Sequence, residues 1–336
     1  MTLADVAREA GVSSQTVSRV MNRKGEVSPE TRDRISSVIE RLGYRPNRVA
    51  QALARQRTNV IGLIVPDITS PFYADVVRGV EDLAHQNDYR VFLCNIVESP
   101  AREQAAIASL EDHGVDGIIL AGSRLDDATL TEIIRGNPNI VLFNRQLPTP
   151  HPYVVRNDDQ MSAYLATQYL LEKGHRVICF MGGQHTSFSR SERVIGYRRA
   201  LAEAAIPDGD ELLFEGSPYL DSGRALIRQV LQKHPDVTAV LAYNDLMAIG
   251  ALQTLKAMGK RIREEIALVG IDDILMARLV SPALTTIRQA KRRAGMTAMN
   301  MMLHRLREDN ASDAKTEQTA PHEVIFKPEL IVRESA

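Results

Sequence analysis

The chain has 336 residues, of which 44% are hydrophobic and 25% charged, a balance typical of globular proteins. It holds no apolar run of the roughly 20 residues that a membrane-spanning helix needs, which argues against a transmembrane protein. Its first residues lack the basic and then apolar segments of a signal peptide, so we expect a cytoplasmic protein. The two cysteines, Cys94 and Cys179, stand singly in apolar runs, which argues against a disulfide framework and against a thiolate zinc site.

The charge is unevenly distributed along the chain. The formal net charge of the whole is −1. Residues 1–57 hold eleven Arg and Lys but six Asp and Glu, a net charge of +5, so the remainder carries −6. A small basic head on an acidic body is the asymmetry expected where one domain meets nucleic-acid phosphates and the other does not.

The basic head predicts three short helices, each bounded by residues that favour helix ends. A serine or threonine precedes each helix as its N-cap, and a glycine follows the first and the third. In the first helix, an aspartate three positions after the threonine completes the pattern of a capping box. The predicted helices cover 4–10, 14–22 and the residues from 29 to 42, with caps at Thr2, Ser13 and Ser28 and stops at Gly11 and Gly43.

The second of these helices has one apolar and one polar face. The apolar face holds Val17, Val20 and Met21, and the polar face holds Ser14, Gln15, Ser18 and Arg19. A first helix, a short turn with a glycine and a second helix with a polar face are typical of a helix-turn-helix. The competing interpretation is a solvated three-helix module whose charges only keep it in solution.

The polar face suits double-stranded DNA. Gln15 has the amide group that makes a bidentate pair with adenine, and Arg19 has the guanidinium that does so with guanine. Ser13 and Asn22 are suited to contacts with phosphates, which position a protein on the duplex without reading its sequence.

The head also carries three motifs in a fixed order. They are Gly11-Val12-Ser13-Ser14-Gln15-Thr16-Val17-Ser18-Arg19-Val20-Met21-Asn22, Val27-Ser28-Pro29-Glu30-Thr31-Arg32 and Leu42-Gly43-Tyr44-Arg45-Pro46-Asn47. These motifs resemble the head of the LacI–GalR family of bacterial transcription regulators. The resemblance implies a DNA-binding surface made by Thr2, Ser13, Ser14, Gln15, Thr16, Ser18, Arg19, Asn22, Asn47, Ala50 and Leu53. Ser14 stands where some relatives carry a larger side chain, so their base preference at that position does not carry over.

The stretch Ala50-Gln51-Ala52-Leu53-Ala54 resembles the hinge helix of the same family. The resemblance implies that this helix orders on operator DNA and that Leu53 wedges into the minor groove. A helix this short is marginal by itself, so folding upon binding is physically reasonable, and an apolar wedge between base steps is a known minor-groove device. The alternative for Leu53 is a core contact with the body.

From residue 59 onward, predicted strands and helices alternate in two series, which is typical of two lobes, each a parallel sheet wrapped by helices. A ligand is then expected in the crevice at the carboxyl ends of the strands. The first series has strands at 60–65, 90–94, 117–121 and 139–143 and helices at 72–86 and 102–113. The second has strands at 177–181, 239–242 and 266–269 and helices at 161–173, 191–204, 222–233 and 246–258.

This body also carries family landmarks, among them Val65-Pro66-Asp67-Ile68-Thr69-Ser70-Pro71-Phe72-Tyr73, Asn244-Asp245-Leu246-Met247-Ala248 and Gly270-Ile271-Asp272-Asp273. It therefore resembles the type I periplasmic-binding-protein-like core of that family, built from two Rossmann-like lobes. The resemblance implies three crossings between the lobes, near 158, 288 and 319. The expected domains are a helix-turn-helix head at 1–45, a hinge at 46–58 and an effector-binding and dimerisation body at 59–336. Its lobe 1 would cover 59–157 and 288–318, and its lobe 2 would cover 158–287 and 319–336.

The resemblance further implies six effector-binding residues: Phe72, Ser123, Arg190, Arg193, Asn244 and Asp272. Phe72 would pack its ring against an apolar sugar face or a base. Arg193 matches a family arginine, and Arg190 lies three residues earlier and is its substitute candidate. An Asp272 that faces Arg193 favours a neutral, polyhydroxylated ligand. The alternatives are structural: core packing for Phe72 and helix capping for Asn244.

Enzyme motifs find little support in the sequence. The chain has neither a GxxxxGK[ST] phosphate loop nor a GxSxG elbow, and its eight histidines lack ligand spacing. We expect no cofactor and no bound metal. A rival interpretation from another class is a sugar-processing enzyme or binding protein with an accessory helical head.

The sequence thus predicts an effector-controlled transcription regulator that binds a dyad-symmetric operator as a homodimer. Repression is the commoner mode in the family it resembles, and a sugar or sugar derivative is the expected effector, with a nucleoside or nucleobase second. Only four residues follow Val332 and they form no heptad repeat. We therefore expect a dimer without the tetramer-forming helix of some relatives.

Overall fold

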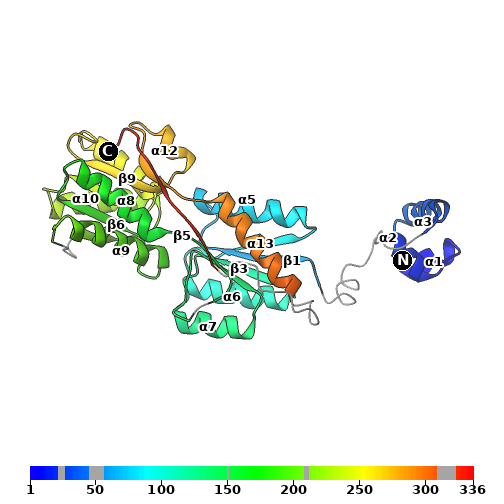
Figure 1. Ribbon diagram of the computed structural model, residues 1–336. Helices are drawn as coiled ribbons and strands as arrows, with labels where there is room; N and C mark the ends of the chain where they lie inside the picture. Colours follow the sequence, from blue (N-terminus) through cyan, green and yellow to red (C-terminus); the bar gives the residue numbers. More distant parts are fainter. Residues whose placement is uncertain (22–26, 45–56, 150, 208–211, 309–322) are drawn as a thin grey trace. The chain divides into compact units, whose positions relative to one another are not determined.

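The computed structural model describes residues 1–21, 27–44, 57–149, 151–207, 212–308 and 323–336. They form two separate units, the head, Met1–Thr58, and the body, Asn59–Ala336 (Figure 1). The predicted hinge helix, with Ala50 and Leu53, lies outside the described residues, as do Asn22 and Asn47.

The head consists of α1 (Leu3–Glu9), α2 (Ser14–Met21) and α3 (Pro29–Leu42), which confirms the three predicted helices. The capping box is present, because the Thr2 hydroxyl accepts from the amide of Asp5 and the Asp5 carboxylate accepts from the amide of Thr2. Gly11 and Gly43 have φ values of +65° and +59°, the left-handed conformation that ends a helix. The core of the head consists of Val6, Ala7, Ala10, Val17, Ile35 and Val38.

The body contains two six-stranded sheets, one in each lobe. The first has the order β11-β5-β4-β3-β1-β2 and the second the order β12-β10-β9-β8-β6-β7. Among the described residues, every strand pairing is parallel except that of β10 with β12. The strands of the first sheet are β1 (Val60–Val65), β2 (Arg90–Asn95), β3 (Gly117–Ala121), β4 (Ile140–Phe143), β5 (Val154–Asn157) and β11 (Glu323–Phe326). Those of the second are β6 (Ile178–Gly182), β7 (Leu213–Glu215), β8 (Ala239–Ala242), β9 (Ala267–Asp272), β10 (Thr285–Arg288) and β12 (Glu329–Ile331).

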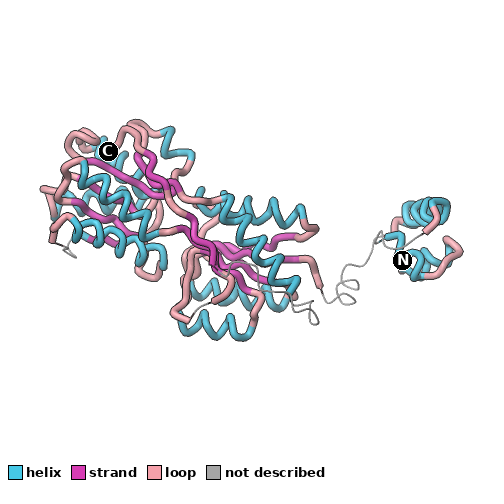
Figure 2. The backbone as a smooth tube through the Cα atoms, in the orientation of Figure 1, coloured by secondary structure: helices cyan, strands magenta, loops and turns pink. Residues whose placement is uncertain are grey.

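Helices cover both faces of each sheet (Figure 2). In lobe 1, α5 (Pro71–Gln86) and α13 (Arg292–Glu308) cover one face, and α6 (Pro100–Asp112) and α7 (Asp127–Gly136) cover the other. In lobe 2, α8 (Asp159–Glu172) and α9 (Phe188–Glu203) cover one face, and α10 (Leu220–Lys233) and α11 (Asp245–Ala257) cover the other. The short α12 (Leu275–Leu279) follows β9. Within the described part of the chain, none of these helices is long and apolar enough to span a membrane.

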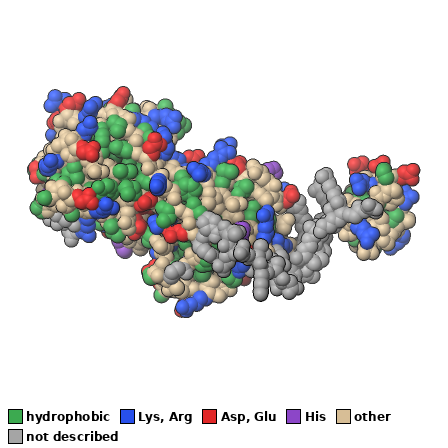
Figure 3. Space-filling model, in the orientation of Figure 1, with side chains coloured by type: hydrophobic (Ala, Val, Ile, Leu, Met, Phe, Trp, Pro, Cys, Tyr) green, Lys and Arg blue, Asp and Glu red, His purple; other side chains and the backbone are tan. Residues whose placement is uncertain are grey.

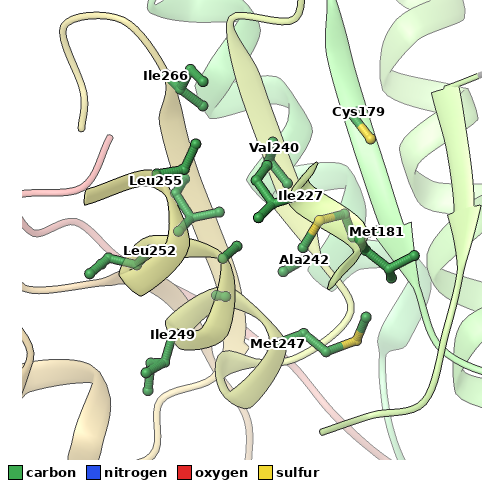
Figure 4. Close-up of a cluster of buried hydrophobic side chains, with 14 of the residues drawn as sticks. Cys179, Met181, Ile227, Val240, Ala242, Met247, Ile249, Leu252, Leu255 and Ile266 are labelled. Atoms are coloured by element: carbon green, nitrogen blue, oxygen red, sulfur yellow. The ribbon is translucent and has the colours of Figure 1, made fainter. Parts of the chain in front are cut away.

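Alternating side chains of the strands supply the two cores of each lobe. In β1, Leu63 packs into the cluster under α5 and α13, whereas Ile64 packs into the cluster with Leu110 of α6. In lobe 2, Val240 and Ala242 of β8 lie beside side chains of α10 and α11 (Figure 4). Because both of their faces are buried, strands such as β1, β3, β6 and β8 are continuous apolar runs, and this pattern made them predictable from the sequence.

The described residues of the body cross between the lobes three times. The first crossing lies between β5 and α8, and the second between β10 and α13. The third was expected near 319, which is wrong: β11 at Glu323–Phe326 still pairs with β5 of lobe 1, and only β12 joins lobe 2. The lobe 1 tail therefore extends through Phe326. Several elements, including α7 and α13, were not predicted.

Glycines bring the paired helices of the body into backbone contact. A Cβ at Gly79 of α5 would overlap the carbonyl oxygen of Arg292 on α13, and one at Gly196 of α9 would overlap that of Gln160 on α8. Gly250 of α11 meets the carbonyl oxygen of Leu220 on α10 in the same way. Each lobe therefore holds helix pairs that cannot separate or slide without breaking close packing.

Replacing Gly250 with valine should destabilise lobe 2 by more than about 3 kcal/mol, because the new side chain overlaps backbone that cannot rotate away. Urea denaturation monitored by circular dichroism measures the loss. Gly136→Val is the matched control, since a Cβ there meets nothing within 4 Å. An equal loss of stability in both variants would contradict the packing argument.

Candidate functional site

A cleft lies at the carboxyl ends of the strands, and residues of both lobes line it. Lobe 1 contributes Asp67, Ser70, Phe72, Tyr73, Glu98, Arg124 and Asn144, and lobe 2 contributes Ser189, Arg193, Pro218, Tyr219, Tyr243, Asn244 and Asp272. The free space between these side chains is about 30 Å³, enough for one or two water molecules. A larger ligand therefore enters only if the lobes separate or the side chains rearrange.

A hydrogen bond between Tyr219 and Asp67 joins the two lobes across the cleft. The Tyr219 hydroxyl donates to Oδ2 of Asp67 at 2.6 Å. The other oxygen of Asp67 accepts from the amide and hydroxyl of Thr69, each at 2.8 Å. Burial works to raise the pKa of Asp67, but these hydrogen bonds outweigh it and hold the pKa below its ordinary value. Asp67 is therefore an ionised group at neutral pH.

Aromatic rings form the wall of the cleft on the side of lobe 1. Phe72, at the start of α5, meets Tyr73 edge-on with ring centroids 5.1 Å apart and packs at a tilt on Phe143. Phe72 is only 5% exposed. Phe72 belongs to the lobe 1 core and also lines the cleft, so core packing and a contact with the effector are compatible for this residue.

A buried ion pair lies beside this wall. Arg124, three residues after the end of β3, donates from Nε to Oε2 of Glu98 at 2.6 Å and from Nη1 to the carbonyl oxygen of Gly122. The two charged side chains are only 4% and 7% exposed. Burial alone would lower the pKa of Arg124, but Tyr73 and Glu98 raise it above its ordinary value. The guanidinium stays charged.

Arg193 of α9 is held by groups inside the protein. Its Nε donates to Oδ1 of Asp159 at 2.8 Å, and it also donates to the carbonyl oxygen of Tyr243 and to the side chain of Gln289. Its guanidinium lies over the Tyr243 ring, 4.6 Å from the centroid. Its ion-pair partner is Asp159, while Asp272 lines the same cleft and contributes to holding the pKa of Arg193 above its ordinary value.

Asp272 at the end of β9 is directed into the cleft by an unusual backbone. It has a φ of +129°, and Asp273 after it has +52°. Lys291 donates to the carbonyl oxygens of both residues, which stabilises this turn. No hydrogen bond to the Asp272 carboxylate is present within the described residues, and its side chain is buried. Desolvation raises the pKa of Asp272 well above its ordinary value.

Asn244 is engaged on both sides of its amide. Its Oδ1 accepts from the amide of Met247 at 2.9 Å, which makes it the N-cap of α11, and its Nδ2 donates to the carbonyl oxygen of Pro218. The capping alternative is therefore correct for this arrangement, although Asn244 also lines the cleft.

Two of the six predicted effector residues do not line the cleft. Ser123 is buried, and its hydroxyl accepts from the amide of Leu125. Arg190 lies along Gly182 at the end of β6, and its Nε has no partner in the described part of the chain. Both were placed by position along the chain, whereas the direction of the side chain decides the contact.

Several side chains of the cleft were not predicted from the sequence, above all Glu98, Arg124, Tyr219 and Tyr243. Asn144 and Tyr243 directly follow the ends of β4 and β8, and Asp67 lies two positions after the end of β1. The rule that ligands bind at the carboxyl ends of parallel strands could therefore have identified these three residues from the sequence.

The head presents a second surface, on α2. Val17 is fully buried, while Ser14, Gln15 and Arg19 are exposed, and neither Gln15 nor Arg19 makes a hydrogen bond or ion pair with another described residue. Ser13 accepts from the amide of Thr16 at 3.1 Å and so caps the helix. Figure 3 shows side chains of both charge signs on the visible face of the head. Gln15 and Arg19 on the exposed side of α2 thus offer an amide and a guanidinium suited to base edges.

Both units match known families. Residues 2–47 match the bacterial regulatory proteins of the lacI family, and residues 58–327 match the periplasmic binding proteins and sugar binding domain of the LacI family. The chain is 38% identical over 287 residues to the HTH-type transcriptional regulator GalR of Salmonella typhimurium strain LT2, covering 85% of this chain and 84% of GalR.

Two solved structures resemble this chain over its full length. The Lac repressor dimer bound to operator and the anti-inducer ONPF has a TM-score of 0.89 at 28% identity, covering 100% of this chain and 98% of that one. The transcriptional regulator CelR in complex with cellobiose has a TM-score of 0.75 at 33% identity, and the two chains cover each other completely. These likenesses confirm the helix-turn-helix head and the body of the type I periplasmic-binding-protein class. The chain belongs to the LacI family of bacterial transcription regulators.

Proposed function

We propose that this regulator is a repressor that binds a dyad-symmetric operator as a homodimer and changes its operator affinity when a neutral, polyhydroxylated molecule binds in the cleft. The observation that carries the proposal is the cleft itself, where polar groups from both lobes meet beside an aromatic wall. A sugar offers an apolar ring face to Phe72 and Tyr73 and hydroxyls to the polar groups. The carboxyl group of Asp272, which makes no hydrogen bond with a described residue, is the group best placed to bind a hydroxyl.

Coupling between cleft and operator follows from the two-lobed construction. A ligand that binds one lobe arrangement more tightly than another shifts the population toward it. By linkage, the effector and the DNA then change each other's affinity by the same factor. The hinge segment at 46–58 that would transmit this change lies largely outside the described residues.

For the head, we propose that Gln15 and Arg19 read bases, while Ser13, Ser14, Thr16 and Ser18 contact the duplex around them. The exposed polar side of α2 supports this assignment. Thr2, Asn22, Asn47, Ala50 and Leu53 complete the proposed surface.

The test is selection of random duplex DNA by the full-length protein, with sequencing of the bound fraction. We expect a dyad-symmetric site, which then serves as the probe for a screen of sugars by operator release. A folded dimer that selects no motif would favour the alternative of a sugar-binding or sugar-processing protein with an accessory head. Operator affinity unchanged at saturating cleft ligand would reject the coupling.

Two exposed apolar surfaces on the body fit a second copy of this chain. β2 is an edge strand of its sheet and exposes Phe92 and Leu93, and α12 exposes Leu275 and Leu279, the latter to 70%. A homodimer buries such surfaces and places two recognition helices on one operator.

Leu279→Glu should therefore weaken the dimer by roughly 2 kcal/mol or more, because each copy of the interface gains a charge in place of an apolar anchor. Sedimentation velocity over a dilution series measures the shift toward monomer. Ile195→Glu on α9, where the side chain is 48% exposed, is the control with the same chemical change. A stable tetramer, or equal weakening by both variants, would contradict the proposed interface.

A further inference from the structure

Two side chains of the cleft have no role in the function proposed so far: Glu98 and Arg124. Both line the cleft from lobe 1, and both are almost completely buried. Arg124 is held at two of its nitrogens, Nε by Glu98 and Nη1 by the carbonyl oxygen of Gly122, and its backbone amide donates to Glu103 at 2.8 Å. Nη2 makes no hydrogen bond with a described residue. Arg124 thus lines the cleft with a guanidinium that is fixed at Nε and Nη1 and whose Nη2 is available to a ligand.

The backbone that carries Glu98 is strained. Val97 and Glu98 have φ values of +49° and +58°, and neither is a glycine. Two successive left-handed residues are costly for L-amino acids and persist only where the surroundings enforce them. The amide of Glu98 donates to the carbonyl oxygen of Pro66 at 3.1 Å, which ties the turn to the end of β1. The fold therefore stabilises an unfavourable turn that directs a carboxylate onto Arg124.

The charges of the cleft explain what this carboxylate does. Two arginines line the cleft, and each has a carboxylate partner inside the protein: Glu98 for Arg124 and Asp159 for Arg193. Asp67 and Asp272 add carboxyl groups that no arginine or lysine side chain of the described residues pairs with. The cleft therefore has many hydrogen-bond donors and acceptors, but its described residues include no positive charge without a carboxylate partner that could bind an anion.

We propose that the Glu98–Arg124 pair is a specificity element that lets Arg124 bind an uncharged ligand oxygen through Nη2 while excluding anionic ligands such as phosphorylated or carboxylated sugars. This inference rests on the proposed function, since it deepens the chemistry of the effector cleft. Glu98 neutralises the guanidinium without occupying its free edge. Removing the charge of Glu98 alone converts the same guanidinium into an anion site.

The test uses inorganic phosphate as the probe, titrated into the full-length protein by isothermal titration calorimetry and followed by phosphorus NMR. Wild-type protein should show no saturable phosphate binding in the cleft. Glu98→Gln, which keeps the shape of the side chain, should bind phosphate at least tenfold more tightly than wild type. The double variant Glu98→Gln/Arg124→Gln should lose that gain. Glu132→Gln, an exposed position on α7 with the same change of charge, should behave as wild type.

Two results would overturn the proposal. One is wild-type protein that binds phosphate saturably and loses it in Arg124→Gln, because the pair would then not exclude anions. The other is a folded Glu98→Gln protein with no gain over Glu132→Gln. The wild-type titration decides the first point even if Glu98→Gln fails to fold. A screen in which no neutral sugar releases the operator would count against the proposed effector and not against the phosphate result, so the two failures are distinguishable.

Discussion

Replacing Arg193 with methionine should lower the free energy of unfolding of the body by about 3–5 kcal/mol and abolish the effector response. The reason for the first effect is Asp159, whose carboxylate is 3% exposed and has Arg193 as its ion-pair partner. Removing one member of a buried ion pair leaves the other charge desolvated and uncompensated. The second effect follows because Arg193 also lies over the Tyr243 ring in the wall of the cleft.

Urea denaturation gives the stability, and operator release by the identified effector gives the response. Arg193→Met/Asp159→Asn is the informative control, since it removes both charges at once. The double variant should recover much of the lost stability while remaining insensitive to effector. If the single variant is as stable as wild type, the ion pair does not stabilise the body; if it still responds to effector, Arg193 is not a ligand contact.

Replacing Arg19 with alanine should reduce operator affinity by roughly 2–6 kcal/mol, because a dimer on a dyad loses a contact worth about 1–3 kcal/mol in each half-site. Arg19 is exposed on the polar face of α2. Its guanidinium can pair with guanine in the major groove, so the loss should fall on one symmetric pair of base positions. Selection of operator variants by the mutant protein measures where the preference is relaxed.

Arg34→Ala on α3 is the matched control for charge. It removes the same positive charge from an exposed position of the head, so it should weaken binding to all sequences about equally and only slightly. Base preferences of Arg19→Ala that match those of wild type would reject the assignment of Arg19 to a base.

Much of the fold could be predicted because the body buries its sheets on both faces. Runs such as Val60–Val65 and Ala239–Ala242 are apolar throughout, which marks a strand inside a parallel sheet. α13 escaped because its buried methionines and alanines stand among arginines, and its apolar positions have no partner in the local sequence. β11 escaped because it is short and half exposed, so only its pairing with β5 reveals it.

The candidate site was predictable in part. The strand-end rule and the family resemblance led to Phe72, Arg193, Asn244 and Asp272, all of which line the cleft. The pairings could not be predicted, because the partner of Arg193 lies 34 residues away on another helix and that of Arg124 lies 26 residues away on another loop. Sequence position alone also does not determine that Ser123 turns inward while its neighbour Arg124 faces the cleft.

The late position of β11 and α13 sets the order in which the protein can fold during synthesis. The head is complete in sequence once residue 44 has been made, whereas the sheet of lobe 1 lacks its edge strand until Phe326 has been added. At about 5–20 residues per second, these events are separated by roughly 15–60 s. Within that interval, from the completion of α5 at Gln86 until α13 ends at Glu308, a nascent chain with a folded head exposes the apolar face of α5 to chaperones and to aggregation.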